Sequence, residues 1–357
     1  MNNNMEDKRI FKIGNTVLTN ESEPFIIAEV GINHNGELER AYEMIRVAKD
    51  AGVDAVKFQT FKSEEFIADK EQTFTYTSQG KSVTESMYQM FKRYEFTEDE
   101  WKKIKLKCDE ENILFLSTPQ NKTDLDLLLK IGISAIKIGS DDFTNIPLIK
   151  EYKKTKLPII MSCGMSDLSE VFHSLETVGF YEGYPVALLL CTSEYPTPND
   201  HVNLLKLKTL RGAFENLLLG FSDHTQGPQS SSLAVALGAV IFEKHFTLDQ
   251  DLPGPDHWFS ENPESLKVWC ESIRTSHKIL GSPVVRPTVQ EKENRLLARR
   301  SIVAISDIQI GETLNEKNTG LKRPGNGIPP IMFDEVLGRK SQKFIPKGNL
   351  IKWEELA

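Results

Sequence analysis

The sequence has no long apolar run and no block of basic residues, and each absence excludes a class of protein. No apolar stretch approaches the roughly 18 residues that a membrane span needs. The first fifteen residues, MNNNMEDKRIFKIGN, lack the apolar core of a signal peptide. A net charge of −8 without a Lys/Arg cluster argues against nonspecific nucleic-acid binding. We therefore expect a cytoplasmic protein that binds neither a membrane nor a nucleic acid.

Cysteine is also scarce, and its four copies show neither CxxC spacing nor tight clustering. This pattern is typical of buried thiols in a reducing compartment, and not of disulfides or a zinc site. The cysteines are Cys108, Cys163, Cys191 and Cys270. We expect all four to be structural.

What the sequence does contain is a regular alternation of eight short apolar runs with amphipathic stretches. Continuous apolar runs of this length are typical of strands buried on both faces. Between the first two runs, residues 37–51 repeat apolar side chains at helical spacing before Gly52. We predict an α/β protein with a (β/α)8 TIM barrel. A doubly wound open sheet is the alternative, but no GxGxxG motif follows the first run. The runs are residues 24–28, 55–58, 113–116, 135–138, 158–161, 186–190, 217–221 and 239–242.

At 357 residues the chain is too long for one ordinary core. After a lead-in of residues 1–24 we place the barrel at residues 25–280. Residues 281–300 contain Pro283, Pro287 and a charged run, and indicate a linker. Residues 301–357 favour a small β-rich domain with a weak internal repeat, since residues 307–314 resemble residues 343–350. So small a module is marginally stable alone, and we expect it to dock on another surface.

One connection, residues 60–97, is much longer than the others. In a barrel it lies on the face where the strands end, and connections of this length are usually functional lids or disordered segments. The aromatic side chains Phe74, Tyr76 and Tyr88 favour a lid.

Two histidines follow two successive apolar runs within residues 220–257. His224 comes after the seventh run and His245 after the eighth, and Asp223, Glu243 and Asp256 are nearby in the sequence. If these runs are parallel neighbours, their ends lie side by side, where barrel active sites occur, and both rings can bind one metal ion. The alternative is that each is an ordinary histidine at the start of a helix.

Lys57 and Lys137 stand inside otherwise apolar runs, where a lysine is rare unless it is paired. Ser162 and Ser222 follow other runs, so these four side chains together favour a site for a phosphate and a carboxylate group. A structural ion pair and a Schiff-base lysine are the alternatives. The candidate acids and bases are Glu29, Asp142 and Asp256, each of which alone could equally be an ion-pair partner.

The ends of the runs carry a series of short motifs. They are IAEVGINHNG (residues 27–36), VKFQT (56–60), FLSTP (115–119), IKIGS (136–140), CTSEYPTP (191–198), FSDHT (221–225), EKHFTLD (243–249) and GPDH (254–257), followed by KRPGNGI (322–328). As a set, and in this order over nearly the whole chain, they resemble the bacterial sialic acid synthases. The last motif resembles the antifreeze-like (SAF) domain of those enzymes, which implies that this domain follows the barrel.

The resemblance implies an enzyme that condenses phosphoenolpyruvate (PEP) with the open-chain aldehyde of an N-acetylated hexosamine. The typical acceptor is N-acetylmannosamine, and the products are a nine-carbon 2-keto sugar acid and phosphate. The resemblance implies that His224 and His245 hold Mn²⁺, or another divalent cation such as Mg²⁺ or Co²⁺, which polarises the aldehyde.

The same resemblance assigns a role to each of the other site residues. Lys57, Lys137, Ser162 and Ser222 would hold the PEP phosphate, Thr118 and Ser140 would lie near its carboxylate, and Gln59 would be a further substrate contact. Glu29, Ser193, Tyr195 and Asp256 would lie near the sugar, and Asp142 would manage a proton or the attacking water. In the family the small domain of one subunit caps the barrel of its partner, which implies a homodimer in which Arg323 reaches the N-acetyl group.

Three positions depart from the family pattern. Asp142 stands where several members carry Glu, Ser193 where the neuraminate enzymes carry Asn, and Cys163 where Thr is common. We expect N-acetylmannosamine as the acceptor, with a 2,4-diacetamido-6-deoxyhexose, the precursor of legionaminic acid, as the alternative. Two further alternatives are a synthase of the 3-deoxy-octulosonate type, which would lack the tail domain, and a non-catalytic carbohydrate-binding or ice-binding protein, which would need neither the lysines nor the histidines.

Overall fold

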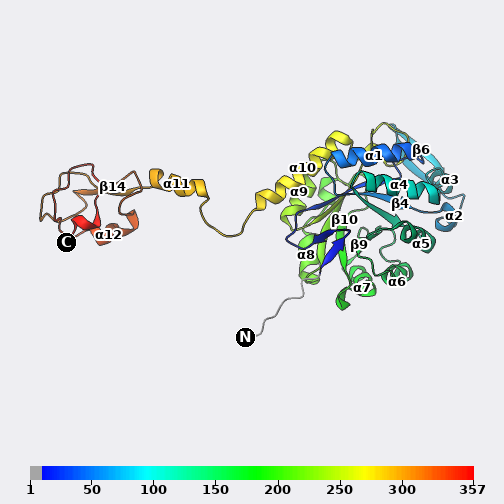
Figure 1. Cartoon of the computed structure of the whole chain (residues 1–357), viewed down its shortest axis with the longest axis horizontal. Coiled ribbons are helices and arrows are strands. Elements are labelled where there is room, and N and C mark those ends of the chain that lie inside the picture. Colours follow the sequence, from blue (N-terminus) through cyan, green and yellow to red (C-terminus); the bar gives the residue numbers. More distant parts are fainter. Residues whose placement is uncertain (1–9) are drawn as a thin grey trace. The chain divides into compact units, whose positions relative to one another are not determined.

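The computed structural model describes residues 10–357 and divides into two compact units, one that ends at Gly281 and one of Ser282–Ala357. The first unit is a barrel of eight parallel strands with helices around it (Figure 1). Parallel ladders join the strands in the order β7-β4-β3-β12-β11-β10-β9-β8, and contacts between β7 and β8 nearly close the ring.

Each apolar run forms one strand, as predicted from the sequence, and most strands continue further at their exit ends. They are β3 (Phe25–Gly31), β4 (Ala55–Thr60), β7 (Leu114–Pro119), β8 (Ile136–Ile138), β9 (Ile159–Ser162), β10 (Val186–Cys191), β11 (Leu218–Asp223) and β12 (Ile241–His245).

The two-residue period of a strand arranges the barrel interior in layers. Near the entry ends the inward side chains are apolar and form one cluster, which includes Ile27, Ala55 and Leu189. Two residues further along the same strands stand Glu29, Lys57 and Cys191. At β11 the residue that pairs with Leu189 and Ile241 of this apolar layer is Gly220, where a Cβ would lie 2.3 Å from Leu189 Cδ2 and 2.4 Å from the Ile241 carbonyl oxygen.

The lead-in that we predicted before the barrel is partly a structural element of it. Of its residues, 1–9 lie outside the described part of the chain. Strands β1 (Phe11–Ile13) and β2 (Thr16–Leu18) form an antiparallel hairpin. The buried side chains Phe11, Ile13 and Leu18 pack against the apolar layer of the barrel. The alternation of apolar and polar residues around Gly14 and Asn15 is the sequence signal for this hairpin.

The helices bury one face against the strands, as their apolar spacing predicts. In α1 the buried side chains are Ala41, Met44, Ile45 and Ala48. In α4, Thr97 and Glu100 form a capping box that satisfies two backbone N–H groups. The helices of this unit are α1 (Leu38–Asp50), α2 (Ser63–Phe66), α3 (Met87–Lys92), α4 (Glu98–Glu110), α5 (Lys122–Ile131), α6 (Ile146–Lys154), α7 (Leu168–Val178), α8 (Lys206–Ala213), α9 (Gln229–Ala236) and α10 (Pro263–Leu280), with 3₁₀ turns at Phe180–Glu182, Asn199–His201 and His257–Phe259.

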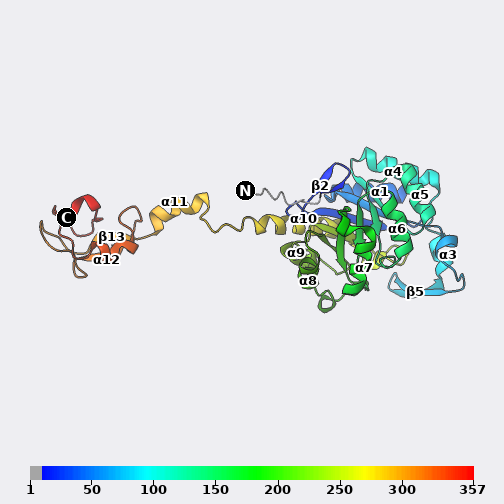
Figure 2. The ribbon, with the colours of Figure 1, turned by 90° about the horizontal axis from the view of Figure 1, so that it is seen from below.

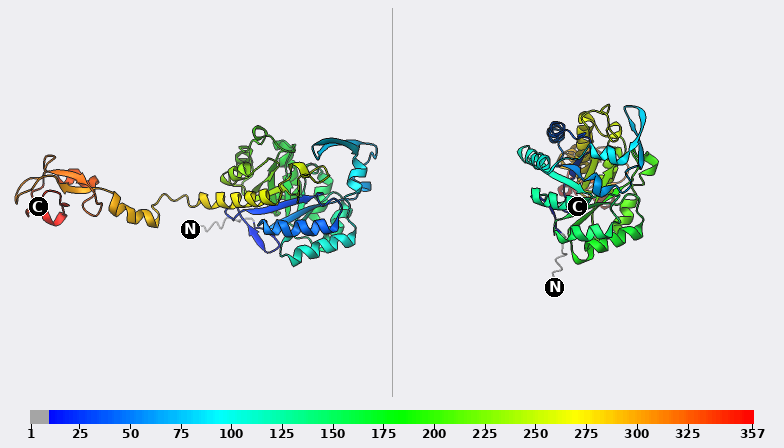
Figure 3. Two further views of the ribbon diagram at one scale, coloured as in Figure 1. Left: turned by 90° about the horizontal axis from the view of Figure 1, so that it is seen from above. Right: turned by 90° about the vertical axis from the view of Figure 1, so that its right-hand side faces the viewer.

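Residues 60–97 are ordered and contain an antiparallel hairpin of β5 (Thr73–Ser78) and β6 (Lys81–Ser86). This hairpin and the β1–β2 hairpin lie at opposite ends of the barrel (Figure 2). The β5–β6 hairpin, drawn in cyan, stands out beyond the strands at the end opposite to the last turn of α10 (Figure 3).

The second unit has its own small core, with Ile302, Ile308 and Ile345 among its buried side chains. Its elements are α11 (Val289–Ala298), β13 (Ser301–Ala304), β14 (Thr319–Lys322) and α12 (Phe333–Val336), with 3₁₀ turns at Pro330–Met332 and Trp353–Glu355. The two repeated segments meet at one antiparallel bridge, Ile308 to Ile345, and do not form regular strands.

Two features of the described residues bear on the remaining sequence predictions. Helix α11 lies inside the predicted linker, where Thr288 and Glu291 form a capping box that starts it. Among residues 10–357, no helix is both long and apolar enough to cross a membrane.

Candidate active site

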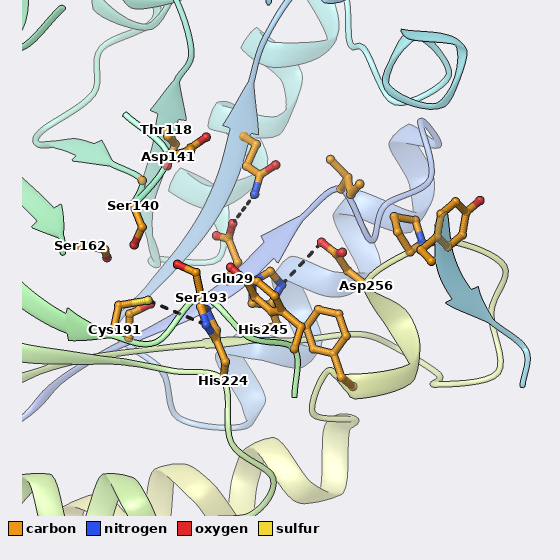
Figure 4. A pocket seen from close by; sticks show the side chains of 18 of the residues that line it. Glu29, Thr118, Ser140, Asp141, Ser162, Cys191, Ser193, His224, His245 and Asp256 are labelled. Carbon is orange, nitrogen blue, oxygen red and sulfur yellow. Dashed lines mark hydrogen bonds and ion pairs between the residues drawn. The ribbon is translucent and has the colours of Figure 1, made fainter. Parts of the chain in front are cut away.

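The exit ends of the barrel strands surround a cavity of about 760 Å³. It is lined by every side chain that the sequence suggested for the site except Asp142 and Arg323. Those lining it are Glu29, Lys57, Gln59, Thr118, Lys137, Ser140, Ser162, Ser193, Tyr195, Ser222, His224, His245 and Asp256. Figure 4 shows Thr118, Ser140 and Ser162 on one side of this cavity and the histidines and Asp256 on the other.

The floor of the cavity is a buried network of two lysines and two glutamates. Lys57 Nζ lies 2.7 Å from Glu29 Oε2 and 3.8 Å from Glu243 Oε2, and Lys137 Nζ lies 3.5 Å from Glu243 Oε1. Lys137 also donates to Ser162 Oγ at 2.7 Å. Both lysines are therefore paired in this structure, and Glu243 joins them.

Glu243 is a site residue to which the sequence analysis gave no role. Lys57 and Lys137 were identified because they are charged residues inside apolar runs. The same criterion applies to Glu243. Ser222 Oγ donates to its Oε1 at 3.3 Å. Its second oxygen, Oε2, is buried and accepts no hydrogen bond from the described residues.

The two lysines differ in how strongly the site holds their charge. Burial lowers the pKa of Lys137. Burial also disfavours the charge of Lys57, but the carboxylates of Glu243 and Glu29 together outweigh it, and the pKa of Lys57 is raised. Burial raises the pKa of Glu29, whereas for Glu243 the two lysines outweigh burial and its pKa is lowered. A charged Lys57–Glu243 pair is thus the most firmly ionised part of the floor.

His224 and His245 lie together above this floor, with ring centroids 5.5 Å apart. His224 Nδ1 lies 2.8 Å from the Thr192 carbonyl oxygen. Because a carbonyl only accepts, Nδ1 carries the proton and Nε2 is left with a lone pair that could bind a metal. Burial holds the pKa of His245 well below its usual range, so this ring is neutral, as a metal ligand must be.

The donor set fits a divalent cation that keeps open positions for substrate and water. His245 Nδ1 is buried and has no hydrogen-bond partner among the described residues, and Asp256 Oδ2 lies 3.8 Å from it (Figure 4). No group of three or more His, Cys, Asp or Glu side chains that could hold a metal occurs in residues 10–357. The protein alone would therefore provide two imidazoles.

The side of the cavity near His224 and Asp256 is aromatic and partly acidic. Tyr195 packs on His224 with ring centroids 4.1 Å apart. Burial and the charge of Glu29 raise the pKa of Asp256 to about 7. Gln59 Nε2 donates to Glu29 Oε1 at 3.2 Å, which holds Glu29 toward the cavity. Asp256 can therefore hold a proton near neutral pH.

Ser140 and Ser193 meet at Gly164. The backbone N–H of Gly164 donates to Ser140 Oγ at 3.0 Å. A Cβ at this glycine would lie 2.3 Å from Ser193 Oγ and 2.7 Å from Ser140 Oγ. The close approach of these two hydroxyls therefore depends on glycine, and the buried Ser193 Oγ has no hydrogen-bond partner among the described residues.

Two predicted residues lie outside the cavity lining. Asp142 accepts a hydrogen bond from Asn145 Nδ2 at 2.8 Å, directly before α6, and its neighbour Asp141 lines the cavity instead. In a short turn after a strand, adjacent residues point in different directions, which the sequence does not reveal. Arg323 belongs to the second unit, where it directly follows β14 and is exposed.

The β5–β6 hairpin forms one wall of the cavity through Phe74, Thr75, Tyr76 and Thr77. The rings of Phe74 and Tyr76 stack with centroids 5.8 Å apart. The backbone N–H of Gly254 donates to Ser78 Oγ at 3.1 Å, and Gln79 Nε2 donates to the Asp251 carbonyl at 2.8 Å. The predicted lid segment is therefore an ordered wall attached to the loop that carries Asp256. Tyr88, outside this hairpin, is buried and donates to Glu64.

All four cysteines are free and buried, as predicted. Cys191 is the one whose surroundings the sequence did not indicate, because it lines the cavity and its sulfur lies 3.8 Å from His224 Nδ1.

Comparison with known proteins gives two family matches. The model of the NeuB family matches residues 44–285, and the model of the SAF domain matches residues 299–357.

Relatives of assigned activity match almost end to end. The chain is 40% identical to N,N'-diacetyllegionaminic acid synthase of Campylobacter jejuni, over 92% of this chain and 98% of that protein. It is 38% identical to the enzyme of the same name from Legionella pneumophila, over 93% of this chain and 94% of that protein. Among solved structures, N-acetylneuraminic acid synthetase from Leptospira borgpetersenii matches with a TM-score of 0.72 at 33% identity, over 80% of this chain and 94% of that chain.

Proposed function

The chain belongs to the NeuB family of sialic and related nonulosonic acid synthases, and on this premise we propose that it condenses PEP with an open-chain N-acetylated hexosamine. The products are a nine-carbon 2-keto sugar acid and phosphate. The observation that carries the proposal is the joint placement of Lys57, Lys137 and the two imidazoles around one cavity. A non-catalytic sugar-binding protein would need neither the lysines nor the histidines.

In this proposal the lysine side of the cavity binds PEP. Lys57 and Lys137 hold the phosphate together with Ser162 and Ser222, and Thr118 and Ser140 lie near the carboxylate. Several hydrogen-bond donors bind an anion more strongly than one donor does, and charge-assisted hydrogen bonds are strongest where water is excluded. Glu243 neutralises the lysines until PEP arrives. The raised pKa of Lys57 also argues against a Schiff base at this lysine, because it stays protonated and is not a nucleophile.

His224 and His245 would hold Mn²⁺ or another divalent cation, which supplies Lewis-acid polarisation of the aldehyde when bound. Glu29, Tyr195 and Asp256 orient the sugar beside PEP. The nucleophile is C3 of PEP, which forms the new bond to the aldehyde carbon. Water adds to the oxocarbenium carbon left at C2, and phosphate departs with cleavage of the C–O bond. For proton transfer we favour Asp256 over Asp142, because Asp256 lines the cavity and has a pKa of about 7.

As the acceptor we propose a 2,4-diacetamido-6-deoxyhexose in place of N-acetylmannosamine, which the sequence led us to expect. Phe74 and Tyr76 of the hairpin, with Met90 and Phe91 behind them, give the cavity an apolar wall. Such a wall suits the methyl groups of a 2,4-diacetamido-6-deoxyhexose better than the hydroxymethyl group of N-acetylmannosamine. The names of the two curated relatives support the same choice. An apolar pocket rejects an added hydroxyl only weakly, so we expect a preference of about 10–100-fold in kcat/KM.

The second unit completes the site in a homodimer. The SAF domain of one subunit caps the cavity of the other, and Arg323 contacts the N-acetyl group of the sugar. An exposed arginine in a small, separately packed unit supports this arrangement. The variant Arg323→Ala should raise the KM for the sugar far more than the KM for PEP, and equal effects on both would contradict the assignment.

The decisive experiment incubates the protein with PEP, Mn²⁺ and each of the two acceptors, with and without EDTA. We expect phosphate release and a 2-keto acid of matching mass, both of which EDTA abolishes. If neither acceptor releases phosphate, the proposed reaction is wrong. If N-acetylmannosamine gives the higher kcat/KM, the reaction stands and the choice of acceptor is wrong.

A further inference from the structure

His224 and His245 each come at the end of a strand. On each strand, one residue between the two that line the cavity faces the opposite way. On β11 and the residue after it, Ser222 and His224 line the cavity, and on β12 Glu243 and His245 do. Side chains alternate along a strand, so Asp223 and Lys244 point to the outer face. The parallel register pairs these two residues directly.

Asp223 and Lys244 form an ion pair on that outer face. Asp223 Oδ2 lies 3.0 Å from Lys244 Nζ, with side-chain exposures of 0% and 3%. Lys244 Nζ also lies 3.4 Å from Glu261 Oε1 and donates to the Thr225 and Gly227 carbonyl oxygens. The residue beside His245 therefore holds the backbone that directly follows His224.

The carboxylate of Asp223 is equally well anchored. Its Oδ1 accepts from the backbone N–H of Thr225 at 2.8 Å and from Thr225 Oγ1 at 2.7 Å, and its Oδ2 accepts from Ser231 Oγ at 2.6 Å. Ser231 in turn accepts from Trp269 Nε1 at 2.9 Å. The pair is thus tied to both α9 and α10, and a carboxylate with this many donors has a fixed position.

From this geometry we propose that Asp223 and Lys244 are positioning residues that set the separation of His224 and His245. Neither touches a substrate or the cation. Their ion pair joins the ends of β11 and β12 on the outer face, at the point where both strands continue into loops. The inference rests on the metal site of the proposed function. Outer residues that orient metal ligands usually contribute about 10–100-fold to metal affinity, and we expect an effect of this size for each member of the pair.

The test measures Mn²⁺ binding to metal-free protein by the EPR signal of free Mn²⁺, without any turnover. The variants are Asp223→Asn and Lys244→Met, each close in shape to the original residue. The double variant removes one positive and one negative charge, so the net charge is unchanged. Ser231→Ala is a milder variant that removes only one support of the carboxylate. Each is used after circular dichroism shows a native spectrum.

We expect the Kd for Mn²⁺ to rise about 10–100-fold in the single and double variants, and by a smaller factor in Ser231→Ala. The matched control is the partly buried ion pair of Arg274 and Asp54, 3.2 Å apart and near the entry ends of β3 and β4. Arg274→Met should leave the Kd unchanged. Lys244→Arg, which keeps the charge, should recover part of the affinity.

Three results would count against the proposal or its premise, and they are distinguishable. If folded variants bind Mn²⁺ as the unaltered protein does, the positioning role is wrong. If Arg274→Met weakens binding equally, the effect is a general loss of stability and the role is also wrong. If the unaltered protein binds no Mn²⁺, the metal site of the proposed function fails. Where the single variants do not fold, Ser231→Ala and Lys244→Arg decide.

Discussion

The lower and upper layers of the barrel interior are built by the same eight strands, yet they differ in almost every physical property. The lower layer is apolar, is sealed by the β1–β2 hairpin, and includes Ile27, Ala55 and Leu189. The upper layer, two residues further along, contains Glu29, Lys57 and the other charged groups of the floor. Burying an apolar side chain stabilises a fold, whereas burying a charge is favourable only when it is paired.

The contrast indicates that the lower layer mainly stabilises the fold, whereas the upper layer provides the groups for catalysis. Active sites of (β/α)8 barrels lie at the exit ends of the strands. In this barrel the interior changes from apolar to charged over only two residues of each strand. Variants in the two layers should therefore have opposite signatures, one in stability and the other in catalysis.

The largest effect should follow loss of the proposed metal, which would lie directly above the upper layer. Treatment with EDTA, or His245→Asn, should lower kcat/KM by about 10³-fold or more, because Lewis-acid polarisation contributes several kcal/mol to the transition state. The melting temperature should change little. Phosphate release and thermal unfolding measure the two quantities, and His173→Asn on the exposed side of α7 is the control. Full activity after EDTA treatment would show that the reaction needs no metal, and this prediction would be wrong.

The opposite signature belongs to the lower layer. Leu189→Ala should lower the free energy of unfolding by about 3 kcal/mol, through lost burial and a residual cavity. The kcat of the folded protein should be unchanged. Cys191→Ala, two residues along the same strand, is the matched control and should destabilise less because it borders the cavity. Urea unfolding gives the comparison, and equal losses in both variants would show that the layers do not differ.

A similar test removes one charge from the floor. Lys137→Met should lower kcat/KM for PEP by about 100-fold, the size expected for one electrostatic contact to a reacting group. Burial already lowers the pKa of Lys137, so removing its charge should cost the fold little. Steady-state kinetics and urea unfolding measure both, with the exposed Lys130→Met as control. A large loss of stability with normal kinetics would identify Lys137 as a structural ion-pair residue.

The smallest effect is a pH dependence of stability caused by Asp256. Its pKa is about 7 in the folded protein and 3.8 as the ordinary value, so the folded state binds the proton more tightly. Stability from this group is complete below pH 3.8 and decreases as the pH rises through about 7. Relative to Asp256→Asn, the unaltered protein should lose about 1 kcal/mol between pH 6 and pH 8. A constant difference between the two proteins over this range would contradict the raised pKa.

The strands and most of the site could be predicted from the sequence because both depend on local pattern. Buried parallel strands need continuous apolar runs, and a polar residue at the end of such a run must face the cavity or the helices. Polar residues after the runs indicated His224 and His245, and charged residues inside the runs indicated Lys57 and Lys137. The structure brings all four into one cavity.

The features that the sequence did not indicate depend on direction and partnership. Asp141 and Asp142 are adjacent in a turn, and only the backbone path decides which one lines the cavity. Glu243 is recognisable as a charge in an apolar run, but its position between two lysines results from strands that are far apart in the sequence. The β1–β2 hairpin is too short to stand out from a polar lead-in.

The shared carboxylate of Glu243 has a consequence for the energetics of ligand binding. An anion that enters between Lys57 and Lys137 must share both ammonium groups with this carboxylate, and a second negative charge raises the proton affinity of a buried acid. We therefore expect anion binding to be accompanied by proton uptake from the solvent. The heat of binding should then depend on the buffer, and the affinity should increase as the pH falls. In the absence of the anion, Glu243 is an internal substitute for it, which keeps the two lysines together and the site assembled.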